Sequence, residues 1–261
     1  RWTRCSSGRC RRSWWSSLLL PKAHARFASC VLVHGMGGTG KTVTAVAAVQ
    51  DDQVRQHYSD IYWLTVGADA VGEKIKQLQG ALFEQLAGKN AQAEQKSEQE
   101  LQQMLVEAMA EKKQALVVLD DPWMPEQVRF LNPIDGSGTN HRMLVTTRIR
   151  DLVPKATRVE LPLMGKNEAV ALLMDLANVD EAEYRKDNPD SSWPPQAAYT
   201  IAAECGLLPI TLTIAAQVVR SWGDGWGEWP RSAFDDCLVT DTRIVCRVQC
   251  TAVAARRARW R

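Results

Sequence analysis

The sequence has no apolar run long enough to cross a lipid bilayer, for which a helix needs about 20 residues. Its longest apolar run near the start, Leu18 to Leu20, is too short for the core of a signal peptide, and no Ala-x-Ala-like cleavage pattern follows it. We therefore expect no membrane partner and no secretion. With 45% apolar and 24% charged residues, the composition is typical of a soluble globular protein.

The seven cysteines include no pair with the C-x₂-C spacing of a strong zinc signature. Their number is odd, and Cys30 and Cys205 lie inside apolar segments where a small buried thiol fits. We therefore expect neither a thiolate metal site nor a disulfide scaffold. A reduced, cytoplasmic setting suits this pattern best.

Acidic residues are absent from both ends of the chain. Residues 1–26 carry seven Lys or Arg and residues 243–261 carry six Arg, so the 19 remaining basic residues share the middle with all 30 acidic ones, a net charge of −11. An acidic middle does not favour a nucleic-acid-binding core, because phosphate contacts need a positive face. The Arg/Trp-rich ends could bind RNA by charge and stacking, but their composition favours disorder.

Short apolar runs separated by helical patterns predict an α/β fold with a parallel sheet and crossover helices. The expected strands cover residues 30–33, 61–66, 115–119, 143–146 and 158–161. The third of these runs is apolar at every position, as expected when helices cover both faces of a sheet.

Helical patterns fill the intervals between these strands and follow the last one. We expect helices over 41–50, over 70–86 with Asp69 as N-cap, and from a Ser97–Glu100 capping box to about residue 113. Beyond Pro162 we expect helices at 166–177, 196–205 and 212–222. The predicted organisation is a basic disordered segment at 1–26, a P-loop nucleotide-binding domain at 27–163, a small helical subdomain at 164–222 and a disordered tail at 223–261.

The loop after the first strand matches the P-loop pattern G-x-x-x-x-G-K-[ST] in full, with the residues Gly35, Met36, Gly37, Gly38, Thr39, Gly40, Lys41 and Thr42. Glycines let successive backbone N–H groups turn toward phosphate oxygens, and the helix that follows adds its positive end. Lys41 supplies a charge for the β and γ phosphates, and Thr42 a hydroxyl for Mg²⁺. We predict ATP or ADP with Mg²⁺ as the ligand, and we count Val43 among the nucleotide-binding residues.

Two acidic residues and one arginine follow later strands at the edge where ligands of parallel sheets bind. Asp120 is placed to hold Mg²⁺, and Asp121 to orient or deprotonate the attacking water. Arg148 is placed to contact the γ-phosphate. Alternatives from spacing alone are a helix cap or turn for the two aspartates, and a surface ion pair with Asp151 for the arginine.

Four motifs together resemble the NB-ARC domain of the signal-transduction NTPases, which is shared by plant disease-resistance receptors and apoptosome-type activators. They are the P-loop, the run Leu116-Val117-Val118-Leu119-Asp120-Asp121-Pro122-Trp123, the run Leu144-Val145-Thr146-Thr147-Arg148, and the run Cys205-Gly206-Leu207-Leu208-Pro209-Ile210. Residues 61–66 also resemble the strand that follows the first helix in that family. The resemblance covers roughly residues 30 to 213.

The resemblance implies a nucleotide-dependent switch with slow turnover, in which exchange of ADP for ATP permits oligomerisation and signalling. It also implies that Arg148 senses the γ-phosphate and that Pro209 packs against the adenine. From the residue alone, Pro209 could equally be a proline that begins a helix. The implied partners are the nucleotide, further copies of the protein, or a signalling protein that acts with the full-length form.

The sequence has no Met-His-Asp triplet after Pro209, whereas family members carry one in a winged-helix unit. We therefore expect the NB-ARC arrangement to stop before that unit. Two other functions remain open: a P-loop ATPase or kinase with conventional turnover, and an inactive fragment that binds only ADP. Enzymatic activity is expected to be at most that of a slow Mg²⁺-dependent ATPase.

Overall fold

A computed structural model describes residues 18–20, 29–134 and 140–222 of the chain. These residues form two compact units: the first ends at Leu161 and the second begins at Pro162, with the loop residues Gly38–Gly40 grouped with the second. Apart from residues 18–20, the predicted disordered segments at 1–26 and 223–261 lie outside the described residues. Leu19 is fully buried in the first unit, and its carbonyl accepts a hydrogen bond from Tyr58 Oη at 2.5 Å.

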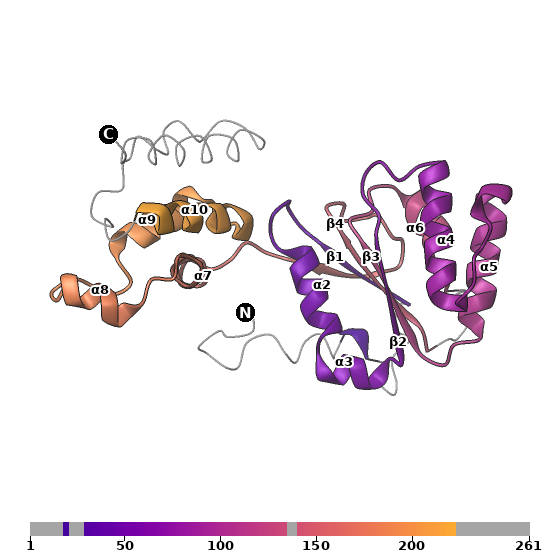
Figure 1. Cartoon of the computed structure of the whole chain (residues 1–261), viewed down its shortest axis with the longest axis horizontal. Coiled ribbons are helices and arrows are strands. Elements are labelled where there is room, and N and C mark those ends of the chain that lie inside the picture. The colour runs from indigo at the N-terminus through magenta and orange to yellow at the C-terminus, as the bar shows by residue number, and fades with distance from the viewer. Residues whose placement is uncertain (1–17, 21–28, 135–139, 223–261) are drawn as a thin grey trace. The chain divides into compact units, whose positions relative to one another are not determined.

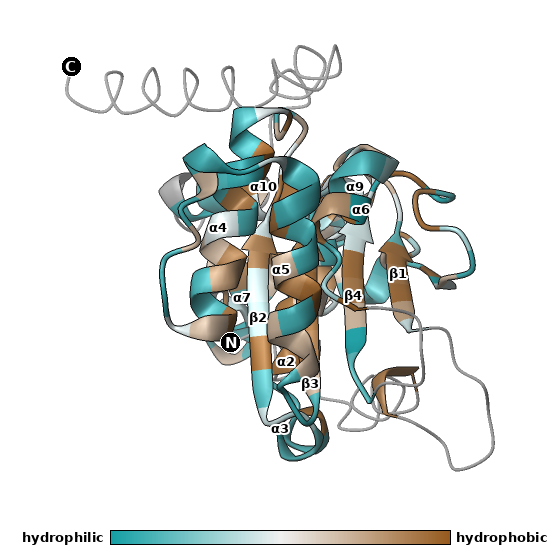
Figure 2. Ribbon diagram, turned by 90° about the vertical axis from the view of Figure 1, so that its right-hand side faces the viewer, coloured by the Kyte–Doolittle hydropathy of each residue, from teal (hydrophilic) through white to brown (hydrophobic). Residues whose placement is uncertain are grey.

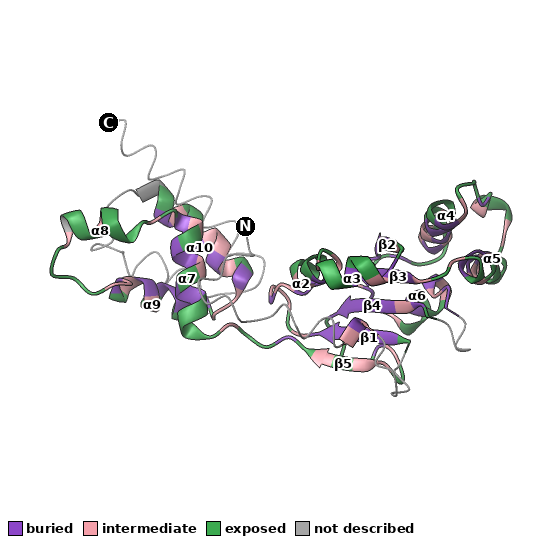
Figure 3. Cartoon of the chain, turned by 90° about the horizontal axis from the view of Figure 1, so that it is seen from below, coloured by how far each residue is buried: buried purple, intermediate pink, exposed green. Residues whose placement is uncertain are grey.

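The first unit is built on a parallel five-stranded sheet with the order β2-β3-β4-β1-β5. Its strands are β1 (Cys30–His34), β2 (Asp60–Thr65), β3 (Ala115–Asp120), β4 (Arg142–Thr147) and β5 (Thr157–Glu160); Figure 1 labels the first four and Figure 3 also labels β5. The α/β prediction is confirmed, because every strand pair is parallel. The strand β4 lies between β1 and β3, so the loops that follow these three strands share one edge of the sheet.

Helices cover both faces of this sheet. They are α2 (Lys41–Val49), α3 (Asp52–His57), α4 (Glu73–Ala87), α5 (Glu98–Ala110) and α6 (Pro125–Leu131), with a short 3₁₀ turn η1 (Ala93–Gln95). One hydrophobic core joins α4, α5 and α6 to one face, and another joins α2 and α3 to the opposite face. Figure 1 shows these two groups of helices on opposite sides of the strands.

Alternate residues of the central strands supply the two cores, because successive side chains of a strand point to opposite faces. In β3, Val117 and Leu119 lie in one core while Leu116 and Val118 lie in the other. The strand is buried along its whole length, as β1 is in Figure 3, and Figure 2 shows the middle of β4 as hydrophobic. The continuous apolar run read from the sequence is thus explained by burial on two sides.

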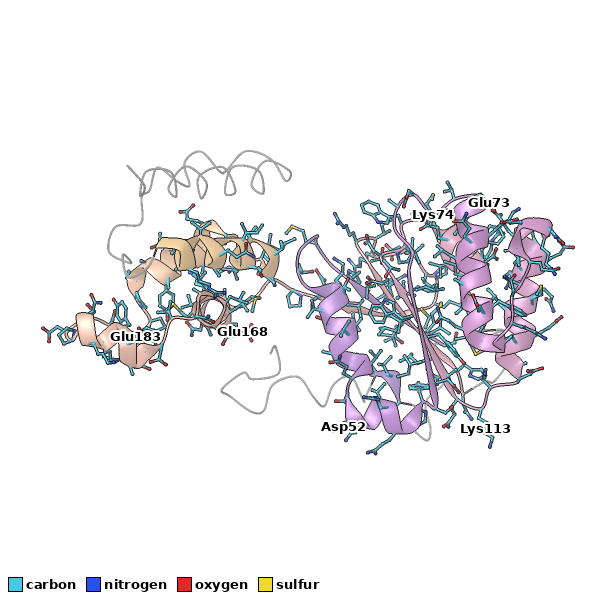
Figure 4. The ribbon with its side chains drawn as sticks, viewed as in Figure 1. Asp52, Glu73, Lys74, Lys113, Glu168 and Glu183 are labelled. Carbon is cyan, nitrogen blue, oxygen red and sulfur yellow. The ribbon has the colours of Figure 1, made fainter. Side chains whose placement is uncertain are left out.

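The start of α4 differs from the prediction. The helix begins at Glu73 after Gly72, and Asp69 does not cap it but forms an ion pair with Lys74 at 2.6 Å. The predicted N-cap is therefore wrong, because the glycine at 72 interrupts the helical pattern. Figure 4 shows Glu73 and Lys74 at one end of the sheet, after β2, and Asp52 and Lys113 at the other end.

The second unit is helical. Its elements are α7 (Lys166–Ala177), α8 (Glu181–Asp187), α9 (Gln196–Glu204) and α10 (Pro209–Trp222). Buried residues of α7, α9 and α10 form a core of their own, which includes Leu173, Ile201 and Leu212. Pro209 is the first residue of α10, which begins earlier than the predicted residue 212.

A turn with two left-handed residues joins α9 to α10. Gly206 and Leu207 have φ of 62° and 58°, and the Leu207 N–H donates to the carbonyl of Ala202 at 3.1 Å. The Thr211 hydroxyl then donates to the carbonyls of Cys205 and Leu208 at 2.6 and 2.8 Å. The turn is therefore held from both helices. No helix in the described part of the chain has the length and hydrophobicity that a bilayer span requires.

Candidate nucleotide-binding site

The P-loop connects the end of β1 to the start of α2 at the carboxyl edge of the sheet. Gly38 and Gly40 have φ of 81° and 89°, in the left-handed region where a side chain would be strained. A Cβ added to Gly37 would lie 3.1 Å from Nη1 of Arg148. Gly38 and Gly40 therefore allow the backbone of the loop to curl, and Gly37 allows Arg148 to lie close to the loop.

Lys41 lies inside the loop that it terminates. Its side chain donates to the carbonyls of Gly35 at 2.9 Å and Met36 at 2.7 Å, and the residue is buried. Burial and the neighbouring Arg148 lower the pKa of Lys41 from its ordinary value, while Asp121 and Asp120 act in the opposite direction. Lys41 and Arg148 thus lie close together, beside the carboxylates of Asp120 and Asp121. Two neighbouring cations are suited to bind a polyanionic ligand.

The Asp120 carboxylate connects three elements. Its Oδ1 accepts hydrogen bonds from the Thr42 hydroxyl at 2.8 Å and from the Thr146 hydroxyl at 2.5 Å. Thr42 belongs to the first turn of α2, Thr146 to β4, and Asp120 ends β3. The side chain is buried, at 5% exposed. The two predicted Mg²⁺ ligands, Thr42 and Asp120, are therefore in direct contact, and their role in holding the ion stays a prediction.

Thr42 and Asp120 have the chemistry of a Mg²⁺ site in a nucleotide complex. A hydroxyl and a carboxylate are hard oxygen ligands, and protein-bound Mg²⁺ usually has one or two protein ligands beside phosphates and water. Among the described residues, no group of three or more His, Cys, Asp or Glu could hold a metal by itself. The residues fit an ion that arrives with a polyphosphate.

Asp121 is held in an unusual backbone conformation, with φ of 56°. Its N–H donates to the carbonyl and to the hydroxyl of Thr146, at 3.0 and 3.1 Å, and its carbonyl accepts from the Gly67 N–H at 3.2 Å. Its Oδ2 accepts from the indole N–H of Trp123 at 3.1 Å. The residue is therefore fixed by hydrogen bonds on both its backbone and its side chain.

Arg148 packs on an aromatic ring. Its guanidinium carbon lies 5.1 Å from the ring centroid of Trp123, a distance within the range of cation–π contacts. The alternative ion pair with Asp151 is absent from the contacts of this described segment, since Asp151 instead pairs with Arg158 at 3.0 Å. Arg148 is therefore directed toward the P-loop and Trp123.

A comparison with protein families matches residues 17–183 to the NB-ARC domain. The chain belongs to this family. Its P-loop NTPase fold agrees with that membership, and the family binds ATP or ADP.

Two known proteins illustrate the similarity in sequence. The NB-ARC chain is 25% identical over 210 residues to apoptotic protease-activating factor 1 of Danio rerio, covering 77% of the chain and 16% of that protein. It is 28% identical over 191 residues to disease resistance protein ADR1 of Arabidopsis thaliana, covering 72% of the chain and 20% of that protein. The chain thus spans a fifth or less of the length of these relatives.

A solved structure of the Aeropyrum pernix ORC2 protein, in ADPNP-ADP complexes, is similar in fold. The TM-score is 0.52 at 14% identity, over 81% of this chain and 63% of that one.

The structure of this NB-ARC chain brings most of the predicted polar site residues to one sheet edge. Lys41, Thr42, Asp120, Asp121 and Arg148 all lie there, connected by the contacts given above. Other predicted residues differ in exposure: Thr39 is buried, whereas Met36 and Val43 are 59% and 44% exposed. Pro209 belongs to the second unit, and its contact with a nucleotide stays a prediction.

Three residues of the NB-ARC site were not singled out from the sequence. Thr146 binds the Asp120 carboxylate, and Trp123 contacts both Asp121 and Arg148. Gln127 is almost fully buried; its Oε1 accepts from the N–H groups of Trp123 and Met124, and its Nε2 donates to two carbonyls of the loop after β2. The sequence gives no signal for these contacts, because Thr146 meets Asp120 only through the strand order and the other contacts depend on loop conformation.

Proposed function

We propose that this NB-ARC chain is an ATP/ADP-binding switch that hydrolyses ATP slowly. The observation that carries the proposal is the hydrogen bond between Thr42 and Asp120 next to a buried Lys41. It brings a phosphate-binding lysine and two Mg²⁺ ligand types, the Thr42 hydroxyl and the Asp120 carboxylate, together at the carboxyl edge of the sheet. Preorganised groups of this kind favour a nucleotide polyphosphate over other anions.

In this proposal the phosphates lie against the backbone of residues 35–42, and Lys41 exchanges its loop carbonyls for phosphate oxygens. Thr42 and Asp120 would hold Mg²⁺, which would supply positive charge to the β and γ phosphates. Arg148 would contact the γ-phosphate, and Asp121 would orient the attacking water. The environments of the Asp121 carboxylate and the Arg148 guanidinium would then both differ between the ATP-bound and the ADP-bound forms.

The signalling part of the proposal rests on the family. The names of the relatives refer to apoptotic protease activation and to disease resistance, which supports a role in defence or cell-death signalling. We propose that nucleotide exchange changes the conformation, and that the longer protein self-associates or binds a signalling partner in the cytoplasm. Val43 and Pro209 are proposed contacts of the nucleotide, Pro209 with the adenine.

Lys41→Ala tests the nucleotide site. We expect it to lower ADP affinity by about a hundredfold, since a buried charge–phosphate interaction is worth about 3 kcal/mol. Isothermal titration calorimetry with ADP would measure the affinities of the wild-type protein and of Lys41→Ala. Lys113→Ala, at the opposite end of the sheet, is the matched control. Unchanged ADP affinity in Lys41→Ala would refute the site.

Two further measurements address the resting state and the turnover. Mass spectrometry of the nucleotide released from purified protein would identify what the site carries. Steady-state phosphate release would measure hydrolysis, and several turnovers per second would indicate a conventional ATPase, because typical enzymes have kcat of about 10 per second.

A further inference from the structure

A single aromatic side chain joins the two groups that would face the γ-phosphate. Trp123 donates its indole N–H to the Asp121 carboxylate at 3.1 Å and places its ring under the Arg148 guanidinium at 5.1 Å. Asp121 follows β3 and Arg148 follows β4, so neither residue is adjacent to the other in the chain. Their relative position therefore depends on what lies between them.

The backbone of Trp123 is itself held by a hydrogen bond to a buried side chain. Its backbone N–H donates to Oε1 of the buried Gln127 at 2.7 Å. The same carboxamide donates at 3.0 Å to the carbonyls of Gly67 and Ala70, in the loop after β2. A side chain with all its hydrogen-bonding atoms in use on backbone groups is rigid. Trp123 is thus anchored to the loop of a neighbouring strand.

Arg148 is exposed, and within the described residues it lies against the ring of Trp123 and close to the P-loop. It is placed close enough to the P-loop for a Cβ on Gly37 to fall 3.1 Å from its Nη1. A long side chain with several rotatable bonds loses considerable entropy when it is held in one position. The ring of Trp123 supplies a flat, partly buried surface on which the guanidinium can lie before the nucleotide arrives.

We propose that Trp123 is a positioning residue that sets Arg148 and Asp121 together for the γ-phosphate, and so determines how well the site distinguishes ATP from ADP. The inference rests on the proposed nucleotide site. The two contacts act on different steps. The ring holds the arginine that binds the γ-phosphate, and the indole N–H holds the carboxylate that orients water.

Two substitutions separate these contacts. Trp123→Leu removes the ring and the N–H, whereas Trp123→Phe keeps a ring under Arg148 and removes only the N–H. Trp63→Phe is the matched control, because Trp63 lies within β2 and its indole N–H donates to Thr65. Circular dichroism and thermal unfolding of each variant would establish that it is folded.

The first readout is the ratio of the dissociation constants of ADP and a non-hydrolysable ATP analogue. We expect Trp123→Leu to weaken binding of the analogue about fivefold while ADP affinity stays within about twofold, the upper size for a cation–π contact of an exposed arginine such as Arg148. Trp123→Phe should restore most of the lost affinity. It should still lower the ATP hydrolysis rate about fivefold, because Asp121 has lost its N–H donor.

The second readout is a double-mutant cycle with Arg148→Ala. If the ring acts through the arginine, Trp123→Leu has no further effect on the affinity for the analogue once Arg148 has been removed. Additive effects, or equal losses of ADP and analogue affinity in Trp123→Leu, would overturn the inference. Failure of the wild-type protein to bind ADP would instead contradict the nucleotide site itself.

Discussion

At the residue scale, one carboxylate oxygen of the site accepts hydrogen bonds from two other elements. Oδ1 of Asp120 accepts from Thr42 and Thr146, which belong to two different elements. The sequence predicts that Thr42 and Asp120 serve the same Mg²⁺ ion, and the first contact agrees with that prediction. It does not predict the second, since the strand order that places β4 beside β3 has to be known first.

Asp120→Asn should separate the structural and the electrostatic roles of this residue. The amide oxygen can still accept from both hydroxyls, so we expect the free energy of unfolding to change by less than about 1 kcal/mol. The charge that Mg²⁺ needs is lost. ADP affinity measured in EDTA should therefore stay within about twofold, while the gain on adding Mg²⁺ disappears.

Asp60→Asn, at the start of β2 and the opposite edge of the sheet, is the control and should keep the full Mg²⁺ effect. If Asp120→Asn also keeps that effect, the ion is not held by Asp120.

His141 is a buried histidine outside the nucleotide site. It is 3% exposed, and its Nδ1 accepts the N–H of Ala115 at 3.1 Å, which requires the neutral ring. Burial lowers its pKa below the ordinary value of 6.5. The unfolded chain then binds the proton more readily than the folded one, so this contribution to stability is complete above about pH 6.5 and is lost as pH falls toward the folded pKa.

His141→Asn should remove this part of the pH dependence, because an asparagine oxygen can accept the same N–H without titrating. Urea unfolding at several values between pH 7.5 and 5.5 would measure it. We expect the free energy of unfolding to fall more steeply with acid in the wild-type protein than in the variant. His57, whose pKa is lowered by burial and by Arg142, contributes to both proteins alike. Parallel curves would contradict the prediction.

At the element scale, long periodic segments are predictable and short ones are not. The all-apolar run at β3 and the helix at 166–177 agree with the structure, and the capping box of Ser97 and Glu100 is confirmed. In contrast, α3, α6 and α8 were missed. Each spans fewer than two full turns and buries few residues, such as Val54 in α3, so none shows a clear apolar period.

The loop contacts of the site were also beyond prediction. The left-handed φ of Asp121 turns its carboxylate toward the indole of Trp123. Aspartate is tolerated in that conformation but does not require it, so the sequence alone gives no reason to expect the turn. The cation–π contact between Trp123 and Arg148 depends on the same turn and on the order of the strands.

The carboxamide of Gln127 bonds the loops after β2 and β3 to one another, in addition to the backbone bond from Gly67 to Asp121. Gln127→Leu would leave two N–H groups and two carbonyls without their partner, so we expect the free energy of unfolding to fall by about 3 kcal/mol. Urea unfolding followed by circular dichroism would measure it. Gln103→Leu is the matched control, since Gln103 is exposed on α5 and bonds only a nearby glutamate; its effect should stay within about 0.5 kcal/mol. Equal losses in both variants would contradict this role.

At the scale of the whole molecule, each unit has its own hydrophobic core. The sheet cores of the first unit and the helical core built on Leu173, Ile201 and Leu212 share no residue. Units with separate cores are able to unfold separately, and ligand binding stabilises only what the ligand contacts. Lys41, Thr42 and Asp120, the side chains proposed to bind the phosphates and Mg²⁺, belong to the first unit, so we expect ADP to raise the stability of that unit.

ADP at about 100 times its dissociation constant should stabilise the first unit by about 2.7 kcal/mol, provided that the unfolded chain does not bind it. Hydrogen exchange of the amides of β1, β3 and β4 would measure this directly, because strands buried on both faces exchange only through large-scale opening. The same ADP concentration should stabilise Lys41→Ala by only about 0.4 kcal/mol, since a hundredfold weaker site is then about half saturated. If the variant gained as much protection as the wild-type protein, ADP would be acting elsewhere than at the P-loop.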